Sequence, residues 1–174
     1  MATKTQKPKY EYPLVVVAVD PGGTTGVVEV LFEADSFHLL VAHQFTDPNK
    51  AHLEVQHIIS AHDLPVHLVV EQWDKRPGIT DPDFSAKYVE RDIDNNVGGY
   101  AVKHKQIPAE AKNMVKEPAR NSGRGDGLKR FGLYSTGKMK HANDAARHAI
   151  TYAVMQLKHL PITLVGWPKP KDKQ

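Results

Sequence analysis

Cysteine is absent from the 174-residue sequence, which excludes disulfide bonds, thiolate zinc sites and cysteine nucleophiles. Long apolar runs are absent too, since the longest, Leu14–Val19, is far too short to span a bilayer. The first residues are polar and contain no apolar core typical of a signal peptide. These absences predict a soluble, cytoplasmic protein with no membrane partner.

The basic residues are concentrated in one part of the chain, although the formal net charge is only +3. Ten lysines and arginines but only three acids fall between Lys103 and Lys140. This uneven charge is typical of a surface that binds a polyanion beside a site rich in carboxylates. A solvated basic surface without a ligand is the alternative that composition leaves open.

The pattern of apolar residues predicts one α/β domain over residues 13–165, between tails at 1–12 and 166–174. Strands are expected at 14–19, 26–32, 37–45, 65–70 and 100–107, and helices at 48–61, 81–97 and 141–160. A loop is expected at 118–127, and Pro161 is expected to end the last helix. The first three strands have the short connections of an antiparallel meander, whereas helices connect the later ones. We therefore expect a five-stranded mixed sheet flanked by helices.

Two acids directly follow apolar strands. Asp20 ends the run Val17-Ala18-Val19, and Glu71 ends the run Leu68-Val69-Val70. Because these two strands are expected to be parallel, the acids should meet at one edge of the sheet, where paired carboxylates suit a hard cation. A buried acid is costly unless its charge is paired or coordinates a metal. Taken alone, Asp20 with the Pro-Gly-Gly that follows is also good turn chemistry.

The last predicted helix begins with histidine and acid residues at helical spacing. His141, Asp144 and His148 are separated by three and four positions, which places them on one helical face. Alanines between them permit close packing, so this face can point metal ligands at the sheet. A simpler interpretation also exists, because the helix dipole favours an acid near the N-terminus.

These three motifs, in this order, resemble those of the RuvC-type Holliday junction resolvases, which have the RNase H-like fold. The segment from Val17 through Asp20 to Gly26 resembles the first family motif, Val69-Val70-Glu71-Gln72 the second, and His141-x-x-Asp144-Ala the third. The similarity covers about residues 14 to 155. Histidine at both ends of the third motif resembles the bacteriophage members, for which the host cytoplasm is the expected location.

The resemblance implies that Asp20, Glu71 and Asp144 are catalytic metal-binding acids. His141 would join them as a ligand, a base or an electrostatic stabiliser. His148 has no counterpart in the family motif, and from its place on the same helical face we expect it to support the ligands without binding the metal. Two Mg²⁺ ions per site, which Mn²⁺ could replace, would serve hydrolysis of a phosphodiester by water. No small-molecule cofactor is expected.

The implied partner is branched DNA, above all the four-way junction, and symmetric cleavage of a junction implies a C2 homodimer. The helix 81–97 is a candidate interface, because Phe84, Tyr88 and Ile93 could extend an apolar stripe beyond the core. Trp73 could act as an aromatic wedge in the junction, although packing explains a tryptophan equally well. The residues expected to contact DNA are Lys75, Arg76, Lys112, Lys116, Arg120, Arg124, Lys129, Arg130, Lys138 and Lys140.

Other functions compete with junction resolution. A nuclease of the same fold could act on flaps, forks or RNA hybrids, and a relative without catalysis could only bind DNA. The residues after Asp20 also resemble the phosphate loop of sugar kinases and actin-like ATPases, but that interpretation leaves Glu71 and Asp144 unexplained. Four further histidines recur every fifth residue, a spacing that cannot bring their rings to one metal, and are expected at the surface: His52, His57, His62 and His67.

Overall fold

The computed structural model describes residues 10–73, 84–101, 103–108, 115 and 127–166. Its centre is a five-stranded sheet with the strand order β3-β2-β1-β4-β5. The strands are β1 (Leu14–Asp20), β2 (Thr25–Phe32), β3 (Phe37–Phe45), β4 (Val66–Gln72) and β5 (Lys103–Pro108). β1, β2 and β3 form an antiparallel meander, and β4 and β5 are parallel to β1. The predicted mixed sheet is confirmed.

The central strands are buried on both faces. Every residue of β1 is buried, and its side chains alternate between two separate core clusters. Val16 and Ala18 belong to one cluster, whereas Val15, Val17 and Val19 belong to the other. A strand covered on both faces is expected to be continuously apolar, which explains the uninterrupted run before Asp20.

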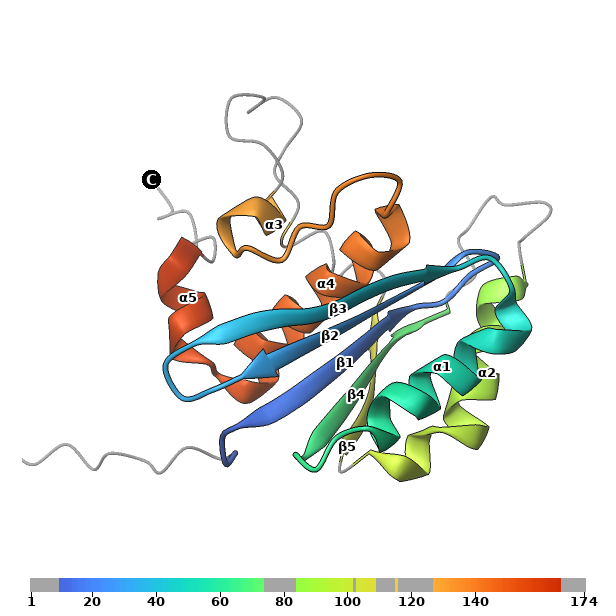
Figure 1. The fold of residues 1–174 in the computed structure, drawn as a ribbon, viewed down its shortest axis with the longest axis horizontal. Helices are drawn as coiled ribbons and strands as arrows, with labels where there is room; N and C mark the ends of the chain where they lie inside the picture. Colours follow the sequence, from blue (N-terminus) through green and yellow to red (C-terminus); the bar gives the residue numbers. More distant parts are fainter. Residues whose placement is uncertain (1–9, 74–83, 102, 109–114, 116–126, 167–174) are drawn as a thin grey trace, which may run out of the picture.

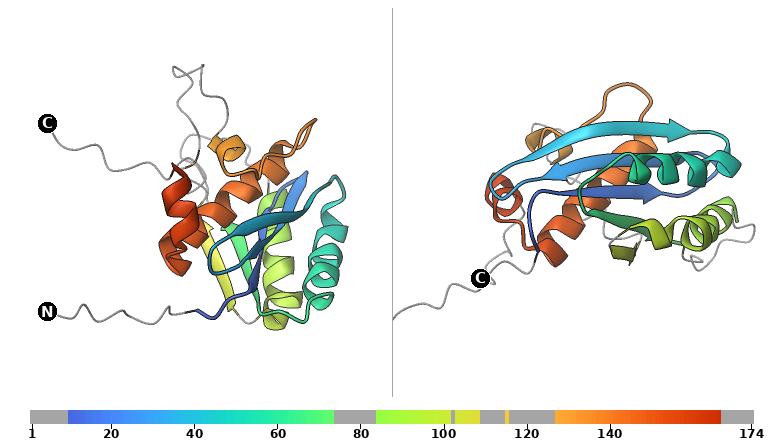
Figure 2. Two further views of the ribbon diagram at one scale, coloured as in Figure 1. Left: turned by 60° about the vertical axis from the view of Figure 1, so that its left-hand side comes forward. Right: turned by 60° about the horizontal axis from the view of Figure 1, so that its bottom comes forward.

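Helices cover both faces of the sheet, as Figures 1 and 2 show. α1 (Pro48–Ser60) and α2 (Ser85–Asn96) lie on one face, and α4 (Lys140–Tyr152) and α5 (Leu160–Gly166) lie on the other. α1 begins as its sequence predicts, because the Asp47 carboxylate accepts a hydrogen bond from the Asn49 amide at 3.0 Å. No helix in these described ranges is long and apolar enough to cross a membrane.

The predicted end of the last helix is wrong. The α-helical part, α4, ends at Tyr152, and a π-helix, η4 (Ala153–Leu157), follows it directly. Lys158 then turns the chain with a positive φ of 56°. Pro161 lies in the first turn of α5 instead of ending the preceding helix. A proline is tolerated there because the first amides of a helix have no partner within the helix.

The predicted helix 81–97 and strand 100–107 also need correction where they are described. α2 ends at Asn96 and is followed by a 3-10 turn, η1 (Gly98–Tyr100), so β5 begins only at Lys103. Ile93 is fully buried in the core and is not part of an exposed stripe. Phe84 and Tyr88, by contrast, are 45% and 60% exposed. A short helix, α3 (Gly127–Arg130), lies where only the end of a loop was expected.

The surface position predicted for His67 is wrong, since the residue is only 4% exposed. Its Nδ1 lies 3.1 Å from the Tyr152 hydroxyl, because the alternation of β4 points it toward α4. His52 and His62 are half-buried and lie against Asp92 and Glu29, at 2.6 and 2.8 Å. Each of these three rings therefore has its own neighbour.

Candidate active site

Two acids project from the same edge and the same face of the sheet. Asp20 ends β1, and Glu71 lies near the end of the neighbouring parallel strand β4. Strand alternation places Asp20 on the face of Ala18, and Glu71 on the face of Val69, both of which pack in the α4 cluster. The Asp20 residue is 4% exposed, and the Glu71 side chain is 12% exposed. The ends of β1 and β4 therefore bring the two acids together at one edge of the sheet, as the sequence predicts.

The first turn of α4 lies directly on this edge of the sheet. Gly26 of β2 pairs with Asp20 and lies so close to α4 that an added Cβ would be 2.1 Å from the backbone carbon of His141. Gln44 of β3 pairs with Gly26 and accepts a hydrogen bond from the His141 amide at 2.9 Å. Its amide group also donates to the Lys138 carbonyl at 3.0 Å. One row across three strands thus fixes where α4 begins.

Both strand acids lie against histidines of α4. The Nδ1 atom of His141 is 2.8 Å from an Asp20 oxygen, and the Nε2 atom of His148 is 2.6 Å from a Glu71 oxygen. His148 is fully buried, whereas the His141 side chain is 34% exposed. The two rings are seven residues apart, or two helical turns, so one face of α4 reaches both strands.

Asp20, Glu71 and His148 form a group that can hold a metal ion. One potential ligand atom from each of the three lies within 4.8 Å of the others. Two carboxylates and an imidazole suit a divalent cation such as Mn²⁺, and carboxylates alone suit Mg²⁺. The Nδ1 atom of His148 is also buried without a hydrogen-bond partner among the described residues. The donor set therefore fits the divalent cation that the sequence motifs imply.

Asp144 lies outside this three-residue group in the described part of the chain. Its carboxylate accepts a hydrogen bond from the guanidinium of Arg147 at 2.6 Å, and the two side chains are 6% and 7% exposed. The sequence predicted Asp144 as a metal ligand, and that role stays a prediction. The pairing with Arg147 was not predicted, because an arginine in a helix ordinarily faces solvent.

A second network holds the chain just after Glu71. The Glu90 carboxylate of α2 accepts hydrogen bonds from the Trp73 amide at 2.8 Å and from the Gln106 side chain at 2.9 Å. Burial raises the pKa of Glu90; the hydrogen bond from the Trp73 amide lowers it, and the charges of Asp94 and Glu71 raise it further. Glu90 therefore fixes the exit of β4 and adds negative charge near the site.

Trp73 packs against α2 in this structure. Its ring stacks on Phe84 with centroids 5.7 Å apart and planes 28° apart, and the Lys87 ammonium lies 5.5 Å from its centroid. These contacts agree with the packing alternative for Trp73. They also place an aromatic pair with a nearby cation beside the exit from Glu71, which is the chemistry that stacks nucleobases.

Four of the predicted DNA-contacting residues are described, and all four are exposed. They are Lys129, Arg130, Lys138 and Lys140. Lys138 and Lys140 immediately precede His141, so they flank the candidate site. The other six lie outside the described residues: Lys75, Arg76, Lys112, Lys116, Arg120 and Arg124.

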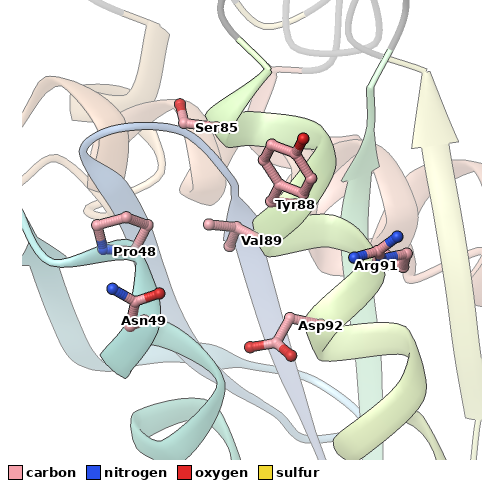
Figure 3. Close-up of a pocket in the computed structure, with 7 residues that line it drawn as sticks. All are labelled: Pro48, Asn49, Ser85, Tyr88, Val89, Arg91 and Asp92. Carbon is pink, nitrogen blue, oxygen red and sulfur yellow. The ribbon is translucent and has the colours of Figure 1, made fainter.

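A hollow of about 350 Å³ lies between the start of α1 and α2 (Figure 3). Its lining is mixed, with the Tyr88 ring and the Arg91 guanidinium 5.7 Å apart on α2. The lining residues are Pro48, Asn49, Ser85, Tyr88, Val89, Arg91 and Asp92. The hollow lies on the helix layer opposite α4, so it is separate from the acids at the sheet edge.

No protein-family model and no curated protein matches the sequence. Solved structures match the fold, including these two. The first, RuvC of T. thermophilus in complex with Holliday junction substrate, has a TM-score of 0.59 and 17% identity over 83% of this chain and 97% of that chain. The second, a Thermus thermophilus RuvC structure, has a TM-score of 0.58 and 16% identity, and the match covers 81% of this chain and 96% of that chain. The fold is RuvC-like.

TM-scores of 0.59 and 0.58 establish the RuvC-like fold, whereas identities of 17 and 16% do not establish the chemistry, which has to be argued from the residues of this chain. The sequence motifs predict Asp20, Glu71, His141 and Asp144, and the structure brings the first three of these side chains together. His148 received only a supporting role, yet its ring lies against Glu71 within the metal-binding group. Its seven-residue spacing from His141 was the signal in the sequence. Gln44 gave no signal, because its partners are 94 and 97 residues away.

Proposed function

We propose that this protein is a metal-dependent endonuclease that cuts branched DNA, with the four-way junction as its main substrate. One observation carries the proposal: Asp20, Glu71 and His148 gather at the strand ends of a RuvC-like sheet. A neighbour with this fold was solved with a Holliday junction substrate. The exposed lysines before His141 support a polyanionic substrate at this edge.

The chemistry we propose is hydrolysis of a phosphodiester bond by water, leaving a 5′ phosphate. Asp20, Glu71 and His148, with Asp144 and His141 as further candidates, would hold up to two Mg²⁺ or Mn²⁺ ions. When bound, these ions lower the pKa of water and stabilise charge on the phosphate oxygens. His141, which touches Asp20 and is partly exposed, is placed to take up a proton.

The DNA would lie across the sheet edge, against Lys129, Arg130, Lys138 and Lys140. Trp73 lies beyond Glu71 with one face of its ring stacked on Phe84, and its other face would stack on a base that opens at the branch. We place the junction wedge at Trp73 in this proposal. The amide of Trp73 is held by Glu90, which fixes the backbone two residues after Glu71.

The protein would act as a homodimer, because paired nicks in a four-way junction need two sites. The outer face of α2 is the candidate interface, since Phe84 and Tyr88 are exposed there, and Tyr88 also lines the hollow of Figure 3. An isologous contact between two copies of α2 would cover these rings.

Cleavage of synthetic four-way junctions, flaps, forks and linear duplex, side by side with Mg²⁺ or Mn²⁺, tests the proposal. We expect paired, symmetric nicks in the junction and little cutting of the duplex. Preferential cutting of flaps or forks would assign the same chemistry to another branched substrate. ATP hydrolysis without cleavage of any DNA would contradict the proposal and favour the kinase-like alternative.

A further inference from the structure

We infer that Arg147 limits the DNA-free protein to one divalent cation, held by Asp20, Glu71 and His148. The inference rests on the metal centre of the proposed function and adds the number of ions and the residue that sets it. It differs from the two-ion, three-acid site that the family resemblance implies. The relevant contacts all lie on α4 and on the two strands beneath it.

The first step of the argument is geometric. The potential ligand atoms of Asp20, Glu71 and His148 lie within 4.8 Å of one another, which is close enough to surround one ion. An oxygen of Asp144 is instead 2.6 Å from the Arg147 guanidinium. A carboxylate that already accepts a charge-assisted hydrogen bond is less available to a cation.

The second step is a count of charge. Asp20, Glu71, Asp144 and the nearby Glu90 carry four negative charges when ionised, and the guanidinium of Arg147, which stays protonated, cancels one of them. The remaining three exceed the charge of one divalent ion by one, and the four charges of two ions are balanced only when Arg147 is removed. Two such ions without DNA would leave a net positive charge among side chains that are mostly buried, which is costly without compensation.

The inference also says when a second ion can bind. The scissile phosphate of DNA brings additional negative charge to the site. A second divalent cation therefore becomes favourable only when DNA is bound, and the two-ion site of the proposed function forms on the substrate. In the DNA-free protein, the positive charge of Arg147 takes the role that the second cation has when DNA is bound.

The test is a titration of the DNA-free, full-length protein with Mn²⁺. Mn²⁺ suits a site with one imidazole and two carboxylates, and its electron paramagnetic resonance signal reports how much stays free. Calorimetry on the same samples gives the stoichiometry and Kd. We expect one ion per chain in the wild type and two in Arg147→Met. Lys50→Met, which removes an exposed positive charge on α1, should still bind one.

A double variant covers the case in which Arg147→Met fails to fold because Asp144 is left buried and unpaired. Replacing both partners of a buried ion pair by apolar or neutral groups is often neutral for stability. Asp144→Asn/Arg147→Met removes one charge of each sign, so we expect one Mn²⁺ and a Kd within about threefold of wild type. A Kd weakened by about tenfold or more, the effect of losing a ligand or its support, would show that Asp144 holds the first ion and would overturn the inference.

Two other results would also overturn it: two Mn²⁺ of similar affinity in the wild type, or one Mn²⁺ in a folded Arg147→Met. Because the titration contains no DNA, it is separate from the proposed function. A wild type that cuts junctions but binds two ions without DNA contradicts only this inference. A wild type that binds one ion but cuts no DNA supports the inference and contradicts the proposed nuclease.

Discussion

Two histidines of α4 determine how the acids of the sheet are held. His141 lies against Asp20, and His148 lies against Glu71, so each carboxylate has an imidazole at hydrogen-bond distance. The His148 ring is fully buried and cannot turn away, whereas the His141 ring reaches solvent. His148 therefore suits a fixed structural or ligand role, and His141 suits exchange of a proton with water.

His159 makes the stability of the fold sensitive to acid. Its ring is 2% exposed, packs edge-on against Phe32 and Tyr12, and donates a hydrogen bond to the Glu33 carbonyl at 2.7 Å. Burial lowers the pKa of His159 below its ordinary value of 6.5, and the carbonyl contacts raise it only in part. The unfolded chain therefore binds this proton at a higher pH than the folded protein does.

We expect the free energy of unfolding to decrease as the pH falls below 6.5, until the folded-state pKa of His159 is reached. Above pH 6.5 both states are neutral at this residue, so its effect vanishes. Urea denaturation at pH 7.5 and 5.5 measures the decrease. His159→Gln keeps a donor for the Glu33 carbonyl but cannot titrate, so it should lose less stability on acidification. An equal loss in both proteins would show that His159 is not responsible.

The sequence predicted the two strand acids better than the side chains that contact the acids. Asp20 and Glu71 follow from the sequence because each comes directly after an apolar run, and the two runs are expected to be parallel strands. The pairs His148–Glu71 and Arg147–Asp144 depend on how α4 is rotated against the sheet, and a periodic pattern does not give that rotation.

Among the elements, the placement of α4 depends on Gly26. A Cβ at this position would be 2.1 Å from the His141 carbon and 2.4 Å from the Ala142 nitrogen, which are backbone atoms that cannot rotate away. Gly26→Ala should therefore push α4 off the sheet, at a cost of about 1–3 kcal/mol, as for other overpacked sites. The shift should also weaken Mn²⁺ binding, because His148 moves with α4. Denaturation and the Mn²⁺ titration measure the two effects.

The matched control is Gly99→Ala, since a Cβ there would meet no atom within 4 Å. We expect the control to keep both stability and metal affinity. If Gly26→Ala were as stable as Gly99→Ala, the close approach of β2 and α4 would not be required.

The two lysines at the start of α4 should determine how strongly DNA binding depends on salt concentration. Lys138 and Lys140 are exposed immediately before His141. If each contacts a phosphate, Lys138→Ala/Lys140→Ala should reduce the slope of log K against log salt by about 2. Fluorescence anisotropy with a labelled junction measures the slope, and Lys50→Ala on α1 is the control. An unchanged slope in the double variant would show that the DNA does not contact this edge of the sheet.

The sequence predicted the types and order of the elements well, but it was less accurate at their ends. The end of the helical segment at Leu157 was missed because Lys158 adopts a left-handed conformation, which a sequence without glycine there does not indicate. Pro161 was assigned to the end of a helix, although proline is equally suited to a first turn. α3 was missed because four residues carry too little periodicity to reveal a helix.

For the whole molecule, the open question is assembly. If the outer face of α2 joins two copies, light scattering should give twice the 19.4 kDa of one chain. Phe84→Ser/Tyr88→Ser should then give a monomer. Leu53→Ser, which removes an exposed apolar side chain from α1, should remain a dimer. A wild type that stays monomeric at all concentrations would contradict paired cleavage, while leaving nuclease activity itself open.

The fold places the acids, the α4 histidines and the exposed lysines at one edge of a single sheet. Strands β1 and β4 and helix α4 supply all the candidate ligands that the structure describes. Helix α4 connects the parts, because its first turn lies beside the lysines and its body carries His148 and Arg147. A substitution that moves α4 should therefore affect DNA binding and metal binding together.

The most direct test of the account is the single-turnover rate at which a four-way junction is cut, compared between wild type and Asp20→Asn. Asp20→Asn removes a charge from the metal-binding group while keeping the size of the side chain. We expect a rate about a thousandfold lower, since the loss of several kcal/mol of charge stabilisation lowers a rate tenfold per 1.36 kcal/mol. Junction binding should be nearly unchanged, and Asp35→Asn, in an exposed turn, should cut like wild type. Equal rates for Asp20→Asn and wild type would contradict the account.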